Sequence, residues 1–215
     1  MFDSVVDRYD LVNTLLSMGL DRWWRRRAVA SLPPLRAARV LDFGCGTGKL
    51  GERLSAGNDV VGLDLSHQML VAAERQLGDR VGFTQGSVFA LPFKEETFDA
   101  AVSGFVLRNL YDLPQAFSEL SRVIRPGGSI AIVDITGPRT AWLRRPFDLY
   151  FGMVAPLLGR LVGQADAYRY LAESLAQLPS REVVCQMLEG AGFTRATATG
   201  MTGGMVTLWT AERGV

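Results

Sequence analysis

An acid-flanked glycine turn and a second acid further along the chain have the spacing of a nucleoside-binding site. Residues 40 to 50 read VLDFGCGTGKL, in which Asp42 ends an apolar stretch. A dinucleotide fingerprint, G-x-G-x-x-G, requires a third glycine where Lys49 stands. Asp64 comes 18 residues after Gly46, where an acid can accept hydrogen bonds from both ribose hydroxyls. Because a carboxylate would repel a pyrophosphate, the pattern favours a cationic, phosphate-free nucleoside such as S-adenosylmethionine.

A second candidate group lies in FVLRNL, residues 105 to 110. Arg108 and Asn109 follow an apolar stretch that reads as a strand. The carboxyl ends of such strands form the edge at which open α/β sheets bind ligands. A guanidinium there is unfavourable unless an anion or good hydrogen-bond acceptors meet it. We therefore predict that this pair contacts a ligand.

Composition narrows the class of protein. The 215 residues suit one domain, and 23 basic and 22 acidic residues give a net charge of +1, which offers no basic face for nucleic acid. Cys45 and Cys185 are far apart and His67 is the only histidine, so neither a disulfide framework nor a metal site is expected. The N-terminus resembles no secretory signal, and no run of about 18 apolar residues occurs. A cytoplasmic protein is predicted.

Hydrophobic periodicity predicts alternating helices and strands. Asp21 and Ser66 are expected to cap helices, and Gly19 and Gly78 to end them. The expected helices cover 2–16, 21–32, 48–56, 66–78, 112–124 and 180–193. The expected strands cover 39–43, 60–64, 81–85, 98–107, 129–135, 194–200 and 204–213, with RPGG at 125–128 as a turn.

This order predicts a doubly wound α/β domain with a mostly parallel sheet and helices on both faces. The short connection around residues 203–204 predicts an antiparallel hairpin between the last two strands. Residues 139–178 are too long for an ordinary connection and are interpreted as a helical cap over the carboxyl edge. The chain is thus predicted to be a single domain, 1–215, with N-terminal helices in 1–32.

Longer motifs add a family resemblance. VLDFGCGTG, VVGLDLSHQML, ALPFKEETFDAAVS and LSRVIRPGG resemble, in order and spacing, the motifs of class I S-adenosylmethionine-dependent methyltransferases. The flanking FDSVVDRYDLVNTLLSMGLDRWWRR, FVLRNLYDL, AYRYLAESLAQLP and GGMVTLW resemble the UbiE/MenG family, which C-methylates quinone precursors. The resemblance runs nearly end to end. It implies a Rossmann-like sheet of seven strands with an antiparallel last strand.

The resemblance also implies a set of cofactor-binding residues. For the glycines the alternative is simple turn geometry, and for Met69 it is ordinary core packing. The implied contacts are Asp42, Gly44, Gly46 and Thr47 around the methionine, Asp64 on the ribose, Leu65 and Met69 at the adenine, Ser87 and Val88 at its edge, and Ser103 beneath the sulfonium.

On the acceptor side the resemblance implies a quinol whose ring carbon attacks the methyl group. The carbon becomes nucleophilic when the neighbouring hydroxyl loses its proton, and Arg108 with Asn109 could stabilise the developing oxyanion. His67 is expected to be an exposed helix residue, so proton removal is assigned to water organised by Arg108 and Tyr9. For each tyrosine the alternative is core packing. The implied substrate-binding residues are Asn13, Tyr150, Tyr168, Tyr170 and Ser174.

Prenylated quinols reside in membranes, so a peripheral membrane contact is expected. DRWWRRRAV and WLRRPFDLYFGMVAPLLGRLVG mix aromatic, apolar and basic residues and are the candidate interfacial surfaces, the alternative being core-facing helices with a solvated basic side. The sequence leaves the oligomeric state, monomer or homodimer, open.

Four positions depart from the family pattern. Ser87 stands where Asn or Asp is usual, Phe89 where Glu is usual, Val106 where Gly is usual and Trp209 where His is common. The bulky apolar replacements among them suggest an altered acceptor pocket. Three functions therefore stay open. They are C-methylation of a prenylated quinol, methylation at C, O or N of another apolar aromatic molecule, and cofactor binding without turnover.

Overall fold

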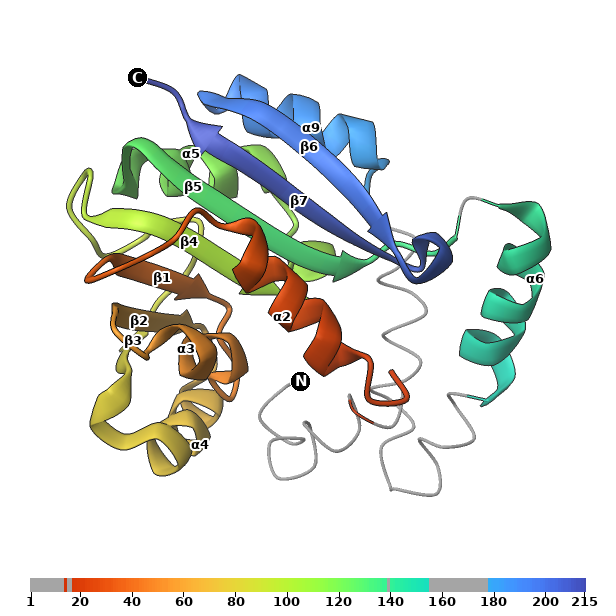
Figure 1. Ribbon diagram of the computed structural model, residues 1–215, viewed down its shortest axis with the longest axis horizontal. Helices are drawn as coiled ribbons and strands as arrows, with labels where there is room; N and C mark the ends of the chain where they lie inside the picture. The colour runs from red at the N-terminus through yellow and green to blue at the C-terminus, as the bar shows by residue number, and fades with distance from the viewer. Residues whose placement is uncertain (1–13, 15–16, 139, 155–177) are drawn as a thin grey trace.

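A computed structural model describes residues 14, 17–138, 140–154 and 178–215. Its centre is a seven-stranded sheet of order β3-β2-β1-β4-β5-β7-β6 (Figure 1). Strands β1 to β5 are parallel, whereas β7 pairs antiparallel with both β5 and β6. The strands are β1 (Arg39–Phe43), β2 (Asp59–Asp64), β3 (Gly82–Gln85), β4 (Phe98–Gly104), β5 (Ile124–Ile135), β6 (Phe193–Met201) and β7 (Val206–Arg213). The predicted sheet and its hairpin are confirmed.

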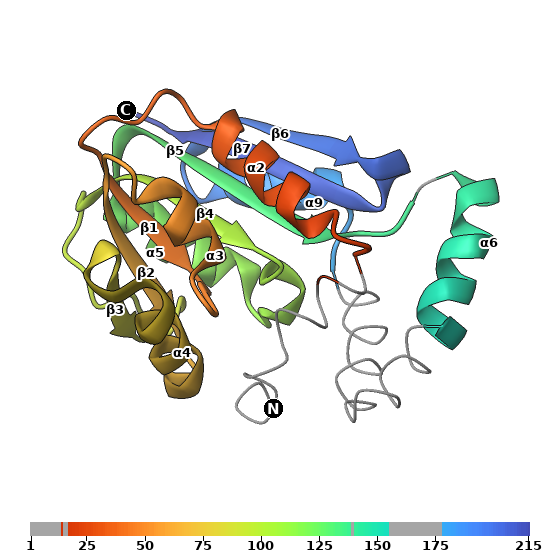
Figure 2. The same cartoon turned by 60° about the horizontal axis from the view of Figure 1, so that its bottom comes forward.

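Helices cover both faces of the sheet, as predicted. Apolar residues of α2 and α3 pack into the core on one face and those of α5 and α9 into the core on the other (Figure 2). The helices are α2 (Asp21–Ser31), α3 (Lys49–Leu54), α4 (His67–Leu77), α5 (Leu113–Val123), α6 (Ala141–Leu149) and α9 (Arg181–Gly190). Shorter turns are the 3₁₀ segments η2 (Gly78–Arg80), η3 (Leu107–Asn109) and η5 (Thr202–Gly204) and the π segment η4 (Tyr150–Val154).

The residues that the sequence predicts to cap or end helices lie mostly where they are expected. Ser66 caps α4 by accepting a hydrogen bond from the Met69 backbone N–H, and Gly78 follows the last residue of that helix. Gly19 has a positive φ of 78° and donates to the Thr14 carbonyl, which suits a residue that ends a helix. The expectation that Asp21 caps α2 is wrong. Asp21 is the first residue of the helix, and its Oδ1 accepts from the Ser17 hydroxyl at 3.1 Å.

Two strand boundaries differ from the predictions by three residues or more. Strand β4 ends at Gly104 rather than continuing to residue 107, because Phe105 has a φ of +68° that no strand accommodates. The expected turn at residues 125–128 is instead the start of β5, which begins at Ile124 and contains a register shift against β4. The premature end of β4 places residues 105–109 across the carboxyl edge.

Part of the expected cap lies in the described residues. Helix α6 and segment η4 stand beyond the carboxyl end of β5, set off from the sheet (Figure 1). Phe147 is the buried anchor of α6, and it packs beside Gly137 at the end of β5. The remainder of the cap, 155–177, and the predicted helix at 2–16 apart from Thr14 lie outside the described residues.

Candidate active site

Two cavities lie at the carboxyl edge of the parallel strands. The glycine-turn cavity, about 370 Å³ in volume, opens beside the ends of β1, β2 and β4. It brings together residues that the sequence places far apart. Of the predicted cofactor residues it is lined by Gly44, Gly46, Thr47, Asp64, Leu65, Met69, Ser87 and Val88.

The glycine turn has this composition for steric and conformational reasons. Gly44 and Gly46 have φ values of 63° and 54°, in the left-handed region. A Cβ at Gly44 would lie 2.4 Å from Cγ2 of Val106, whereas a Cβ at Gly46 would meet nothing within 4 Å. Gly44 is therefore required by its neighbour, while Gly46 leaves open space in the wall of the cavity.

Asp64 joins the turn to helix α4. Its Oδ2 accepts from the Gly46 backbone N–H at 2.8 Å, and its Oδ1 accepts from that of Ser66 at 2.9 Å. These bonds fix the carboxylate at the end of β2, where it lines the cavity. The predicted ribose-binding acid is thus placed at the strand end and held rigidly.

Asp42 and Ser103 lie behind the cavity wall rather than in it. Asp42 is 1% exposed and its Oδ2 accepts from the Gly51 backbone N–H at 2.9 Å. Burial raises the pKa of this carboxyl to about 7, against the opposing effects of the Gly51 hydrogen bond and the Arg25 charge. The Ser103 hydroxyl donates to the Phe43 carbonyl at 2.7 Å. The structure does not bring these two predicted side chains to the cavity.

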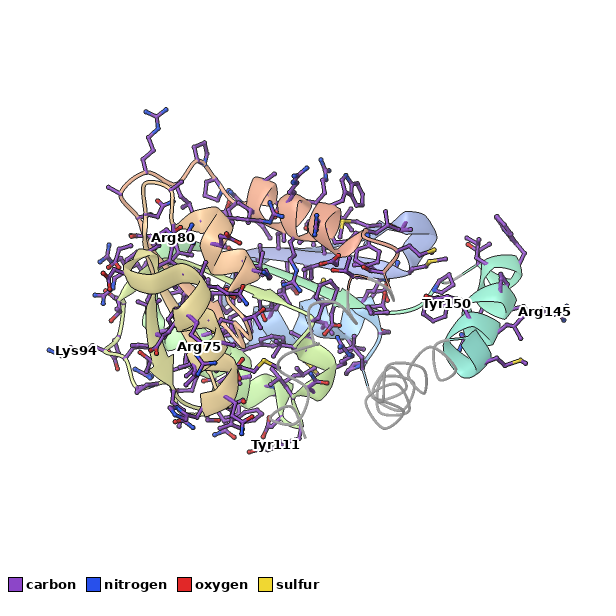
Figure 3. All side chains as sticks on the ribbon, turned by 90° about the horizontal axis from the view of Figure 1, so that it is seen from below. Arg75, Arg80, Lys94, Tyr111, Arg145 and Tyr150 are labelled. Atoms are coloured by element: carbon purple, nitrogen blue, oxygen red, sulfur yellow. The ribbon has the colours of Figure 1, made fainter. Side chains whose placement is uncertain are left out.

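The second cavity, named here the α6 cavity, is about 250 Å³ and largely apolar. Trp24 of α2, Phe147 of α6 and Tyr150 of η4 contribute aromatic walls. Figure 3 shows Tyr150 on the side of its segment that faces the sheet, whereas Arg145 projects from the opposite side. Phe105 lines both cavities. The two spaces therefore adjoin at the residue whose backbone bends the chain out of β4.

Among the described residues, Arg108 is the only basic side chain that lines the α6 cavity. It forms an ion pair with Asp134, and its backbone N–H also donates to that carboxylate at 3.1 Å. Asp134 is wholly buried, and Arg108 Nε is buried without a partner among the described residues. The sequence argument required an anion for Arg108 but did not identify Asp134. The signal was available in an acid that interrupts the apolar strand SIAIVDI.

Arg108 and Asn109, which the sequence pairs, line different cavities. Asn109 lines the glycine-turn cavity and Arg108 the α6 cavity, because the 3₁₀ turn η3 directs successive side chains apart. Of the predicted substrate-binding residues only Tyr150 lies in the described part of the chain, and it lines the α6 cavity. Outside the described residues lie Tyr9, Asn13, Tyr168, Tyr170 and Ser174.

The family departures are distributed differently from the expectation. Phe89 and Val106 line the glycine-turn cavity, and Phe89 packs against Tyr111 with ring centroids 4.2 Å apart. Trp209 is fully buried in the core beneath α9, and its indole donates to the Arg181 carbonyl at 3.3 Å. The expectation that Trp209 alters the acceptor pocket is therefore wrong. His67 is exposed, as predicted.

The glycine-turn cavity suits S-adenosylmethionine. Asp64 is placed for a ribose, apolar residues such as Leu65 and Met69 for an adenine, and Gly46 leaves room along the turn. Arg25 is the one basic side chain among the described lining residues, too few charges for a pyrophosphate. No group of His, Cys, Asp or Glu in the described ranges could hold a metal ion. Fold and cavity together define a class I S-adenosylmethionine-dependent methyltransferase.

Comparison with known proteins gives the family. Residues 1–213 match the model of the ubiE/COQ5 methyltransferase family, and the chain belongs to this family. It is 40% identical over 219 residues to the demethylmenaquinone methyltransferase of Clavibacter sepedonicus, covering 100% of this chain and 88% of the relative. It is 37% identical over 220 residues to the ubiquinone/menaquinone biosynthesis C-methyltransferase UbiE of Hahella chejuensis, covering 98% and 88% respectively.

Solved structures agree on the fold. An S-adenosylmethionine-dependent methyltransferase of Thermotoga maritima superposes with a TM-score of 0.71 at 18% identity, covering 99% of this chain and 97% of that one. A phosphoethanolamine N-methyltransferase of Haemonchus contortus, in complex with S-adenosylmethionine, gives a TM-score of 0.68 at 15% identity, covering 100% and 60%. Within the described part of the chain, no helix has the length and apolarity needed to cross a bilayer.

Proposed function

We propose that the protein transfers a methyl group from S-adenosylmethionine to a ring carbon of a quinol of the menaquinone or ubiquinone type. The observation that carries the proposal is the pair of adjoining cavities. One has the strand-end acid and open glycine turn that suit the nucleoside, and the other is apolar with an arginine at its wall. The relatives that match this chain end to end bear the names of quinone-pathway C-methyltransferases.

Bound S-adenosylmethionine supplies an electrophilic methyl group on a sulfonium sulfur. The protein's first task is placement, because in-line transfer to carbon requires the two reactants to be aligned. Phe105 lies between the two cavities and its backbone N–H donates to the Val133 carbonyl at 2.7 Å, which fixes the boundary. The apolar walls of the α6 cavity exclude water from the acceptor ring.

Arg108 stabilises the oxyanion that forms when the quinol hydroxyl loses its proton. Loss of this proton makes the ring carbon ortho to the hydroxyl nucleophilic. That carbon bonds the methyl group as the carbon–sulfur bond breaks, and the ring then releases its own hydrogen as a proton. Asp134 orients the guanidinium and balances its charge, so that Arg108 contributes a directed hydrogen bond more than a net charge. Water is the proton acceptor in this proposal, organised by Arg108 and Tyr9.

Labelled methyl transfer tests the proposal. The protein is incubated with methyl-labelled S-adenosylmethionine and either demethylmenaquinol or a simple naphthol ether that lacks a free hydroxyl. The proposal predicts label on a ring carbon of the quinol, stable to acid and base, and none on the ether. Label on oxygen or nitrogen, or transfer only to some other aromatic acceptor, would replace this function by the second one that the sequence leaves open.

We further propose that helix α6 and segment η4 touch the membrane that holds the prenyl tail. Trp142, Leu149 and Met153 are 72%, 57% and 65% exposed, and Arg144 and Arg145 stand among them. An apolar surface with basic flanks suits an anionic bilayer interface. By contrast, α2 directs Trp24 into the core and offers a solvated basic side.

Flotation with anionic vesicles at low salt distinguishes the two helices. Replacing Trp142 and Leu149 together by Ser is expected to abolish co-flotation, while Trp23→Ser on α2 leaves it unchanged. Failure of the unaltered protein to float, or equal losses in both variants, would remove the membrane contact without affecting the methyl-transfer proposal.

A further inference from the structure

Arg25 of helix α2 is a buried cation to which the family resemblance assigns no contact. It is 8% exposed and lines the glycine-turn cavity. It lies on the side of the helix that faces the core, together with Trp24 and Ala28, which are also buried. A long cationic side chain is seldom buried unless an anionic group or hydrogen-bond acceptors compensate its charge.

The described residues compensate the charge of Arg25 only in part. Nε of Arg25 is buried and hydrogen-bonds to none of them. The carboxylate Oδ2 of Asp21 lies 3.8 Å from that nitrogen, beyond hydrogen-bond reach, and the guanidinium stacks 4.9 Å from the ring centroid of Phe105. These contacts orient the group and partly balance its charge, but Nε still lacks a hydrogen-bond acceptor in a side chain that lines the cavity.

The place of Arg25 in the cavity identifies what it can bind. A Cβ at Gly104, at the end of β4, would lie 3.2 Å from Nη1 of Arg25, so the guanidinium stands over that strand end. Asp64 stands at the end of β2, and β1 with its glycine turn runs between β2 and β4. The two charged groups are thus separated by two strand spacings, roughly 10 Å. That span matches the reach of the nucleoside from its ribose hydroxyls to the carboxylate of its amino acid.

We propose that Arg25 binds the carboxylate of the methionine moiety of S-adenosylmethionine. This inference rests on the proposed cofactor and adds a residue and a direction to it. The ribose lies on Asp64, and the amino acid runs along the glycine turn toward α2. Asp21 holds the guanidinium in place and accepts from Ser17 through its other oxygen at 3.1 Å. A bidentate pair between guanidinium and carboxylate accounts for an arginine at this position.

Binding of two ligands that differ only in the carboxylate tests this. Adenosylhomocysteine and its decarboxylated analogue, S-adenosyl-3-thiopropylamine, are titrated by calorimetry into the unaltered protein and into Arg25→Gln. The unaltered protein is expected to prefer adenosylhomocysteine by roughly 10- to 100-fold, the range of one charge-assisted hydrogen-bonded pair. In Arg25→Gln the preference falls to about one, while the affinity for the analogue stays nearly unchanged. Arg26→Gln, an exposed neighbour on α2, leaves both affinities unaltered.

The outcomes separate the possible failures. If Arg25→Gln weakens both ligands by the same factor, Arg25 has a structural role only and the inference is overturned. If that variant does not fold, Arg25→Lys keeps the charge, and it must retain part of the preference for the carboxylate. If the unaltered protein binds neither ligand, the proposed cofactor itself fails, which is a different result from a lost preference.

Discussion

The glycine-turn cavity and the α6 cavity adjoin, yet they are built in opposite ways. The first is lined by short stretches that follow strand ends, such as residues 44–47 and 63–66, so that each stretch is a local motif. The second takes its walls from α2, from the end of β5 together with α6, and from the start of β7, three parts of the chain that lie far apart in sequence. A cofactor site built on strand ends can be recognised from sequence, whereas a substrate site assembled from distant elements cannot.

The largest effect is expected at the ion pair of the α6 cavity. Arg108→Gln leaves Asp134 buried without a cation, which should lower the free energy of unfolding by about 3–5 kcal/mol. Turnover should fall with it. In the double variant Arg108→Gln/Asp134→Asn two neutral amides replace the charges, so most of the stability returns while turnover stays low. Urea denaturation and kcat measure the two effects, and recovery of kcat in the double variant would make Arg108 purely structural.

The next effect concerns pH and the acid behind the glycine-turn cavity. Burial raises the pKa of Asp42 from 3.8 to about 7, so the folded state holds a proton that the unfolded state releases. Stability from this group is therefore lost as pH rises from about 4 to about 7, by a few kcal/mol in all. Asp42→Asn should remove this slope from denaturation curves recorded across the window. An unchanged slope in the variant would show that the carboxyl titrates normally.

A smaller effect is expected at the glycine turn, where the two glycines form a matched pair. Gly44→Ala brings a Cβ against Val106 and should cost about 1–3 kcal/mol and weaken adenosylhomocysteine binding. Gly46→Ala meets no neighbour and should cost only the roughly 1 kcal/mol of its left-handed backbone. Adding Val106→Ala should rescue Gly44→Ala in thermal denaturation and calorimetry. Equal losses at both glycines would refute the steric account.

The smallest effect is expected from removing one tyrosine hydroxyl in each cavity. Tyr150→Phe in the α6 cavity should raise the acceptor KM a few-fold, the effect of about 1 kcal/mol from one hydroxyl, with cofactor affinity unchanged. Tyr111→Phe, on the glycine-turn cavity, should leave the acceptor KM alone. Steady-state kinetics at varied acceptor concentration give the KM of both variants. A change of the acceptor KM in Tyr111→Phe alone would reverse the assignment of the two cavities.

These differences also explain how far the sequence could be interpreted. Strand alternation, the Ser66 cap and the acid at position 64 depend on local chemistry, and each could be predicted. The end of β4 could not, because the positive φ of Phe105 is imposed by the surrounding fold and not by a glycine. Asp134 and Arg25 were missed for a similar reason. Their partners are brought to them by tertiary packing, and their sequence signal is only a charge within an apolar face.

The central claim is that the nucleoside and the acceptor ring occupy the two cavities and meet at Phe105. A crystal structure with adenosylhomocysteine and a non-reactive quinone analogue tests it most directly. The claim predicts the ribose on Asp64, the sulfur directed toward Phe105, and the ring in the α6 cavity beside Arg108. A nucleoside in the α6 cavity, or a ring bound away from Arg108, would contradict it.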